Sequence, residues 1–102
     1  MSGLLNKLVC DGSMQLLGEV PACPFASAIV RVINRTNDDA QIKVCITTSD
    51  LPTAVDEVEP GCIVPALGKY VETGFIVSAG EKFYVQAPAG CVARLELIQE
   101  AQ

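Results

Sequence analysis

Cysteine is the residue type in this chain with the most chemistry to offer. Five cysteines occur among 102 residues, at widely separated positions: Cys10, Cys23, Cys45, Cys62 and Cys91. No two of them form a C-x-x-C motif, so the spacing favours neither a structural zinc site nor a thioredoxin-type redox pair. Two interpretations stay open. The thiols are either small buried apolar side chains, a common fate of cysteine, or surface groups that form disulfides between subunits.

The positions of the five cysteines in the predicted strands divide them into one expected core thiol and four expected surface thiols. Cys91 is in phase with the apolar residues that follow it in its strand, so it is expected in the core. The other four are candidates for interchain disulfides, because they lie in the N-terminal segment, on the polar face of a strand or beside a loop glycine: Cys10, Cys23, Cys45 and Cys62. Such bonds would form after assembly, once the protein leaves a reducing cytosol for an oxidising medium.

Other reactive groups are scarce. The chain has no histidine, which removes the commonest general base and the commonest metal ligand. It also has no G-x-S-x-G motif and no phosphate-binding loop. The acidic residues Asp50, Asp56, Glu57 and Glu59 could hold a divalent cation, but they lack the EF-hand spacing, and a solvated loop accounts for them better. We therefore expect no enzyme, no metal and no cofactor.

Charge and hydropathy narrow the range of partners. Twelve acidic residues against seven basic ones give a net charge of −5, and the few aromatic residues are not interleaved with basic ones. Nucleic-acid binding is therefore not expected. No apolar run approaches the roughly 20 residues that cross a bilayer, and the first residues fit a signal peptide poorly. We expect neither a membrane nor a small-molecule substrate as a partner.

Short strands are the elements that must position these residues. Glycine and proline interrupt the chain roughly every ten residues, and apolar residues alternate with polar ones. Residues 28–34 and 40–48 are predicted to form an antiparallel hairpin, and Ile42, Val44 and Ile46 of the second strand are expected in the core. The pattern predicts an all-β fold, a single β-sandwich or jelly-roll-like domain.

The first 25 residues are predicted to form an N-terminal hairpin or arm, packed on their own or a neighbouring subunit, while residues 26–102 form the sandwich. Asp11-Gly12 between two apolar runs is a hairpin signal. Alternatively, the apolar runs could add to the sheet edge of a neighbouring subunit. The candidate residues of such an assembly arm are Leu4, Leu5, Leu8, Val9, Leu16 and Leu17.

Two short motifs make the sequence similar to a known group of proteins. Asn34-Arg35-Thr36 follows the first core strand, and an E-T-G…A-G-E string runs from Glu72 to Glu81 into a late strand. In these marks, and over the stretch from Val20 to Glu100, the chain resembles small β-sandwich structural proteins of tailed-phage virions. These serve as capsid decoration or cement proteins, or as head, collar, tail and fibre attachments. The group has no catalytic motif to carry over.

The resemblance implies a virion structural protein, above all a capsid decoration or cement protein, made in the host cytoplasm. Its expected partners are itself, in a homotrimer, and other virion proteins such as the major capsid protein. A collar, tail or fibre attachment protein is the alternative within the virion. A receptor- or carbohydrate-binding module is the alternative from another class, although a chain with no Trp and two Tyr has few side chains to stack on sugar rings.

Overall fold

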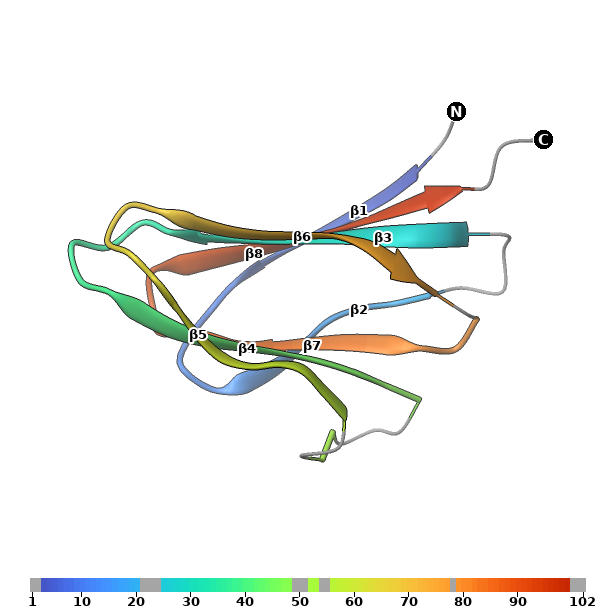
Figure 1. Ribbon diagram of the computed structural model, residues 1–102, viewed down its shortest axis with the longest axis horizontal. Helices are drawn as coiled ribbons and strands as arrows, with labels where there is room; N and C mark the ends of the chain where they lie inside the picture. The colour runs from blue at the N-terminus through green and yellow to red at the C-terminus, as the bar shows by residue number, and fades with distance from the viewer. Residues whose placement is uncertain (1–2, 21–24, 49–51, 54–55, 78, 100–102) are drawn as a thin grey trace.

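The computed structural model describes residues 3–20, 25–48, 52–53, 56–77 and 79–99. Eight strands occur within these ranges: β1 (Gly3–Val9), β2 (Met14–Glu19), β3 (Phe25–Asn34), β4 (Ala40–Thr47), β5 (Glu57–Val64), β6 (Lys69–Ile76), β7 (Lys82–Gln86) and β8 (Cys91–Gln99). They form two four-stranded sheets that face each other as a β-sandwich (Figure 1). None of the described residues belongs to a helix with the length and apolar character that a membrane crossing needs.

The strand order is that of a double-sheet jelly roll. The first sheet has the order β1-β8-β3-β6 and the second sheet has the order β2-β7-β4-β5, with antiparallel pairing between the neighbours. Most turns therefore carry the chain from one sheet to the other, which is how two Greek keys are built from eight strands. The all-β expectation of a single β-sandwich or jelly-roll-like domain is confirmed.

The predicted hairpins do not form, because their strands lie in different sheets. β1 pairs with β8, and β2, beyond the Asp11-Gly12 turn, pairs with β7. β3 and β4 are likewise separated between the first and the second sheet. A tight turn can join strands across a sandwich as well as within one sheet, and its residues do not tell the two apart. Both N-terminal strands pair within their own chain; exchange of this segment with a neighbouring subunit stays a prediction.

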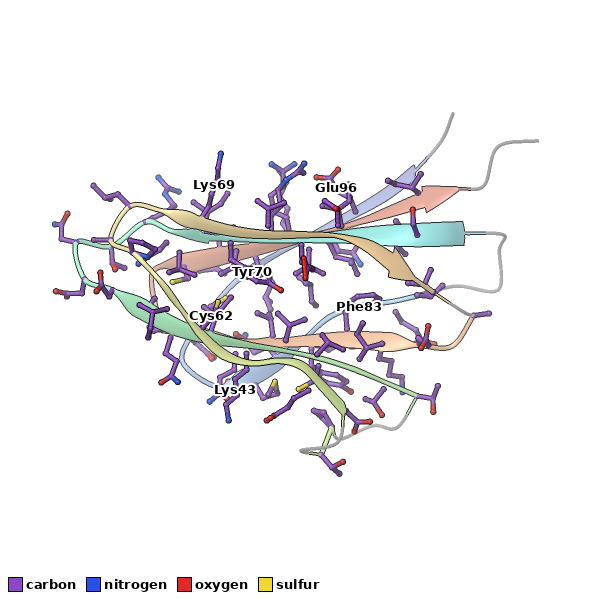
Figure 2. All side chains as sticks on the ribbon, in the orientation of Figure 1. Lys43, Cys62, Lys69, Tyr70, Phe83 and Glu96 are labelled. Atoms are coloured by element: carbon purple, nitrogen blue, oxygen red, sulfur yellow. The ribbon has the colours of Figure 1, made fainter. Side chains whose placement is uncertain are left out.

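The core lies between the sheets and is built from the inward face of each strand. The expected inward face of β4 is confirmed: Ile42 and Val44 are fully buried, and Ile46 is partly buried against the core. The largest fully buried side chains on β3, β4, β7 and β8 that belong to the core are Val30, Val32, Ile42, Val44, Phe83, Val85, Leu95 and Leu97. Figure 2 shows Phe83 pointing into the space between the sheets. Each of these side chains contributes roughly 1.5–3 kcal/mol through burial, so this interior is a main source of attraction between the two sheets.

Asn34 gives the Asn34-Arg35-Thr36 motif a structural cause. Its side chain is 1% exposed, and its Nδ2 donates hydrogen bonds to the carbonyl oxygens of Asp38, Val64 and Pro65 at 2.8, 3.1 and 3.1 Å. Its Oδ1 accepts hydrogen bonds from the backbone N–H and the hydroxyl of Thr36 at 3.0 and 2.7 Å. One buried amide thus fastens the β3–β4 turn to the β5–β6 turn.

Candidate functional site

Two of the cysteines lie opposite each other in the core. The β1–β8 register pairs Val9 with Val92, which places Cys10 against Cys91, and the Cys10 amide donates a 2.9 Å hydrogen bond to the Cys91 carbonyl. Their side chains are 3% and 0% exposed. Cys91 thus occupies the core, in phase with its apolar neighbours. A surface position for Cys10 is wrong, because the residue continues the inward face of the β1 edge.

Burial suppresses the reactivity of both thiols. Desolvation raises the pKa of Cys10 to about 11, and the nearby Cys91 thiol and Asp11 carboxylate add to the rise. Desolvation raises the pKa of Cys91 as well, and its Sγ lies 3.8 Å from Oδ1 of Asn34. Since the thiolate is the nucleophilic form, both groups are weak nucleophiles at neutral pH while the fold stays closed.

Cys45 lies on the outer face of the second sheet but is not a surface thiol. It faces away from the core, as its strand phase predicts, between Tyr84 of β7 and Glu57 of β5. Only 1% of Cys45 and 8% of Tyr84 are exposed. Burial raises the pKa of Cys45, and the charges of Glu57 and Asp56 raise it further. The expected exposure is wrong because larger side chains on both neighbouring strands flank the small thiol.

Cys62 is the least buried of the described cysteines. It lies on β5, an edge strand of the second sheet, and packs against the core together with Tyr70 of β6, an edge strand of the first sheet (Figure 2). Cys23 lies outside the described residues. No disulfide joins Cys62 to any other cysteine that the structure describes. Interchain disulfides stay a prediction for Cys10, Cys23, Cys45 and Cys62; the burial of Cys10 and Cys45 makes Cys62 the best placed of the described thiols.

The candidate arm residues divide between the interior and the surface. Leu17 is 4% exposed in the core and Leu8 packs against it, so their apolar surface already belongs to this subunit. Val9 and Leu16 point outward with 69% and 48% exposure, because neighbouring residues of a strand face opposite sides. The backbones of Leu4 and Leu5 pair with β8. Exposed apolar side chains are therefore left on β1, an edge strand of the first sheet, and on β2, an edge strand of the second sheet.

The outer face of the first sheet carries a row of cations that sequence reasoning missed. The register places Lys7 of β1 beside Arg94 of β8, and Arg94 beside Arg31 of β3. Lys69 of β6 lies on the same outer side (Figure 2). Like charges directly opposite each other destabilise a sheet, and the ion pair between Arg31 and Glu96 offsets only part of this repulsion.

Arg94 is at the centre of this row, and one of its hydrogen-bond donors has no acceptor in the described ranges. Its Nε is buried and lacks a hydrogen-bond partner among the described residues. A buried donor without a partner costs about 1–3 kcal/mol. The cations are bordered by aliphatic side chains: Val9, Val92 and Ile33 form the next row across the sheet, and Val71 is 42% exposed. We call these residues, with Lys7, Arg31, Lys69 and Arg94, the basic face.

Part of the acidic cluster has a structural role. The Asp56 carboxylate accepts hydrogen bonds from the backbone N–H and the hydroxyl of Thr53 at 2.8 and 3.2 Å, and Glu57 forms a 3.6 Å ion pair with Lys43. Asp50 and the side chain of Glu59 lie outside what the structure describes. Across the described ranges, no group of three or more Cys, Asp or Glu side chains could hold a metal ion.

A hollow on the second sheet offers little chemistry. Its lining residues are Gly12, Gln41, Lys43, Gln86, Ala87 and Pro88. The lysine already pairs with Glu57, and the glutamine amides are neither acids nor bases at neutral pH. The basic face is therefore the strongest candidate for a functional surface.

Comparison with known proteins finds similarity in fold. No model of a known protein family matches the sequence, and no curated protein matches it. A solved structure of Bacillus endospore appendages, described as disulfide-linked pili, aligns with a TM-score of 0.57 at 8% identity, over 97% of this chain and 87% of that chain. The Anabaena sensory rhodopsin transducer aligns with a TM-score of 0.52 at 17% identity, over 86% of this chain and 98% of that one.

Proposed function

We propose that this chain is a non-enzymatic structural subunit that associates with copies of itself through the basic face. The supporting observation is the row Lys7–Arg94–Arg31, together with the buried Nε of Arg94. In an isolated subunit this row costs stability through repulsion and desolvation. An acidic partner surface would relieve both costs, and the bordering aliphatic side chains suit a protein partner.

The distribution of charge makes a second copy the partner that fits best. The basic face takes Lys7, Arg31, Lys69 and Arg94 of the seven cationic residues, and none of the acidic residues belongs to it by definition; among the described acidic side chains, the one that pairs with this row is Glu96. Apart from these four cations and Glu96, the sequence holds three cationic residues against eleven acidic ones. Contact between the basic face of one copy and the acidic remainder of the next is heterologous. Such a contact closes into a ring, for example a trimer, or continues into a filament.

The setting that we propose for this subunit is a tailed-phage virion, where it would serve as a capsid decoration or cement protein on the major capsid protein. The support is the sequence resemblance from Val20 to Glu100, and the jelly-roll fold is compatible with it. A closed homotrimer is the arrangement proposed for this role. A collar, tail or fibre attachment protein is the alternative place in the virion.

A filament subunit is the second candidate. It is favoured by the similarity in fold to the Bacillus endospore appendage, whose pili are disulfide-linked, and by the five cysteines of this chain. Cys62, on the edge strand β5, and Cys23 are the thiols proposed to join neighbouring subunits in such a filament. Both candidates share the self-association that we propose. They differ in whether the repeated contact closes into a ring or continues into a filament.

The oligomeric state of the purified chain tests the proposal. Light scattering after size-exclusion chromatography is expected to show an oligomer at low salt that dissociates at 1 M salt, where the screening length falls from about 10 Å to about 3 Å. Arg94→Glu is expected to shift the chain to monomer. Lys43→Glu makes the same change of charge on β4 of the second sheet, outside the basic face, so it is the matched control and should keep the oligomer.

The outcomes separate the candidates. A closed trimer supports the decoration protein, whereas filaments in electron micrographs support the second candidate. A monomer band on a non-reducing gel of the assembled protein would count against interchain disulfides. A wild-type chain that remains monomeric at low salt and high concentration would refute self-association, and equal behaviour of the two variants would refute the basic face as its site.

A further inference from the structure

We propose that Cys10 and Cys91 form an intrachain disulfide that joins β1 to β8 under oxidising conditions. This inference does not depend on the proposed function. It rests on the register of the two strands and on the shared burial of the two side chains. It also differs from the sequence-based expectation, in which Cys10 bonds to a neighbouring subunit.

The backbone geometry suits such a bond. The register that pairs Val9 with Val92 continues to Cys10 and Cys91, and the Cys10 amide donates to the Cys91 carbonyl at 2.9 Å, whereas the Cys91 amide donates to the Pro88 carbonyl at 3.2 Å. Opposed residues in a hydrogen-bonded antiparallel pair have Cα atoms about 5.5 Å apart, within the 4.4–6.8 Å that disulfides usually span. Both side chains enter the core from the same face of the sheet. Their Cβ atoms, typically about 4.5–5.5 Å apart in such pairs, need to approach by roughly 1 Å.

The position of Cys10 permits this approach. In the sheet formed by the described residues, β1 is an edge strand with β8 as its neighbour, and Cys10 follows its last residue, at the end of the ladder. A strand that is bonded on one side can shift there without breaking a second ladder. No other described cysteine has a cysteine opposite it, since Cys45 faces Tyr84 and Glu57, and Cys62 faces Ile42. Among the described cysteines, opposition across a strand ladder is therefore specific to Cys10 and Cys91.

The oxidant that we invoke is a small-molecule disulfide such as oxidised glutathione. The thiolate of Cys10 attacks it, which gives a mixed disulfide and releases one molecule of glutathione. The thiolate of Cys91 then attacks the Cys10 sulfur, which forms the Cys10–Cys91 bond and releases the second glutathione. Overall, two protein thiols are oxidised to one disulfide, and the glutathione disulfide is reduced to two thiols that take up both protons.

The burial of both thiols sets the rate of this reaction. The raised pKa of Cys10, about 11, leaves little thiolate at neutral pH. Access for the oxidant requires the end of β1 to open. We therefore expect oxidation to be slow in the native state, to accelerate with increasing pH, and to accelerate again in urea concentrations below the unfolding midpoint.

Peptide mapping of the oxidised full chain tests the inference. The reduced protein is incubated with oxidised glutathione at pH 8, alkylated with iodoacetamide and digested with trypsin. Cleavage after Lys and Arg puts Cys10 and Cys23 in residues 8–31, Cys91 in residues 83–94, and the other two cysteines together in residues 44–69. We expect a disulfide-linked pair of 8–31 and 83–94 in a species that migrates as a monomer. Its melting temperature should be higher by roughly 10 °C than that of the reduced chain.

Two variants identify the cysteine involved. Cys23→Ser should retain the linked peptides and the rise in melting temperature, whereas Cys10→Ala should lose both. Linked peptides that persist in Cys10→Ala would assign the bond to Cys23 and overturn the inference. So would linked peptides found only in a covalent dimer, or full alkylation of wild-type Cys10 and Cys91 after oxidation in urea, where access is no longer limiting.

Discussion

Single residues in this chain show that strand phase and exposure are different properties. The alternation of apolar and polar residues predicted the inward position of Cys91 and the outward position of Cys45. It did not predict that Cys45 is buried, because its cover comes from Tyr84, a residue 39 positions away in the sequence. Nor did it reveal the partner of Cys10, which lies 81 positions away. The alternation of apolar and polar residues predicts which face of the strand a side chain is on. The side chains of neighbouring strands determine whether that side chain is exposed to solvent.

The buried Cys10 thiol should make the fold less stable at alkaline pH. Below pH 9 the thiol is protonated in both the folded and the unfolded chain, so it adds no pH dependence. Between about pH 9 and pH 11 the unfolded chain loses the proton while the folded chain retains it, because the pKa is raised to about 11 in the fold. The free energy of unfolding should therefore fall with rising pH, at a limiting slope of about 1.4 kcal/mol per pH unit.

Urea unfolding at pH 8 and pH 10.5 measures this effect. Cys10→Ala should lose less stability between the two pH values than the wild type, since both chains share every other titrating group. Identical losses in the two chains would show that Cys10 ionises as readily in the folded state as in the unfolded state.

The strands themselves were largely predictable, whereas the sheets were not. The inward faces of β3, β4, β7 and β8 follow from period-two alternation, which depends on neighbours in the sequence. Assignment of a strand to a sheet depends on contacts between distant residues, and turn residues such as Asp11-Gly12 are compatible with either sheet. The Asn34-Arg35-Thr36 motif is visible in the sequence, but its cause lies in the β5–β6 turn, about 30 positions further on.

Asn34→Ala should destabilise the link between these two turns. The substitution removes the amide that the carbonyls of Asp38, Val64 and Pro65 share and leaves buried acceptors without a donor. We expect a loss of about 2–4 kcal/mol in the free energy of unfolding. Urea unfolding measures it, and Asn37→Ala, in the exposed part of the same turn, is the control and should change stability by less than about 0.5 kcal/mol. Equal effects of the two substitutions would contradict this role.

At the scale of the whole molecule, the basic face is the feature that no local pattern contains. Lys7, Arg31 and Arg94 are separated by 24 and 63 positions, and only the order β1-β8-β3 brings them into one row. From the sequence alone, the apolar N-terminal residues were the expected site of self-association instead. Of those, Leu8 and Leu17 are engaged in packing within the subunit.

Arg94→Leu should stabilise the monomer and weaken its association. The substitution removes the buried Nε without a partner and the repulsion from Lys7 and Arg31, which together cost about 1–3 kcal/mol. Urea unfolding of dilute protein should show the gain in stability, and light scattering at higher concentration should show the loss of oligomers. A variant that loses stability and oligomers together would indicate that Arg94 serves the fold of the subunit rather than a partner.

The pairing of β1 with β8 also has a consequence for synthesis on the ribosome. Of the eight described strands, β1 is translated before the others, and its partner in the sheet, β8, is translated after them. At roughly 5–20 residues per second, the N-terminal strand waits several seconds before its partner emerges. During that interval its apolar side chains and unpaired amides are available to other nascent chains. Slower translation, or a higher density of ribosomes on the messenger RNA, therefore increases the risk of aggregation of the nascent chain, even though the folded protein is stable.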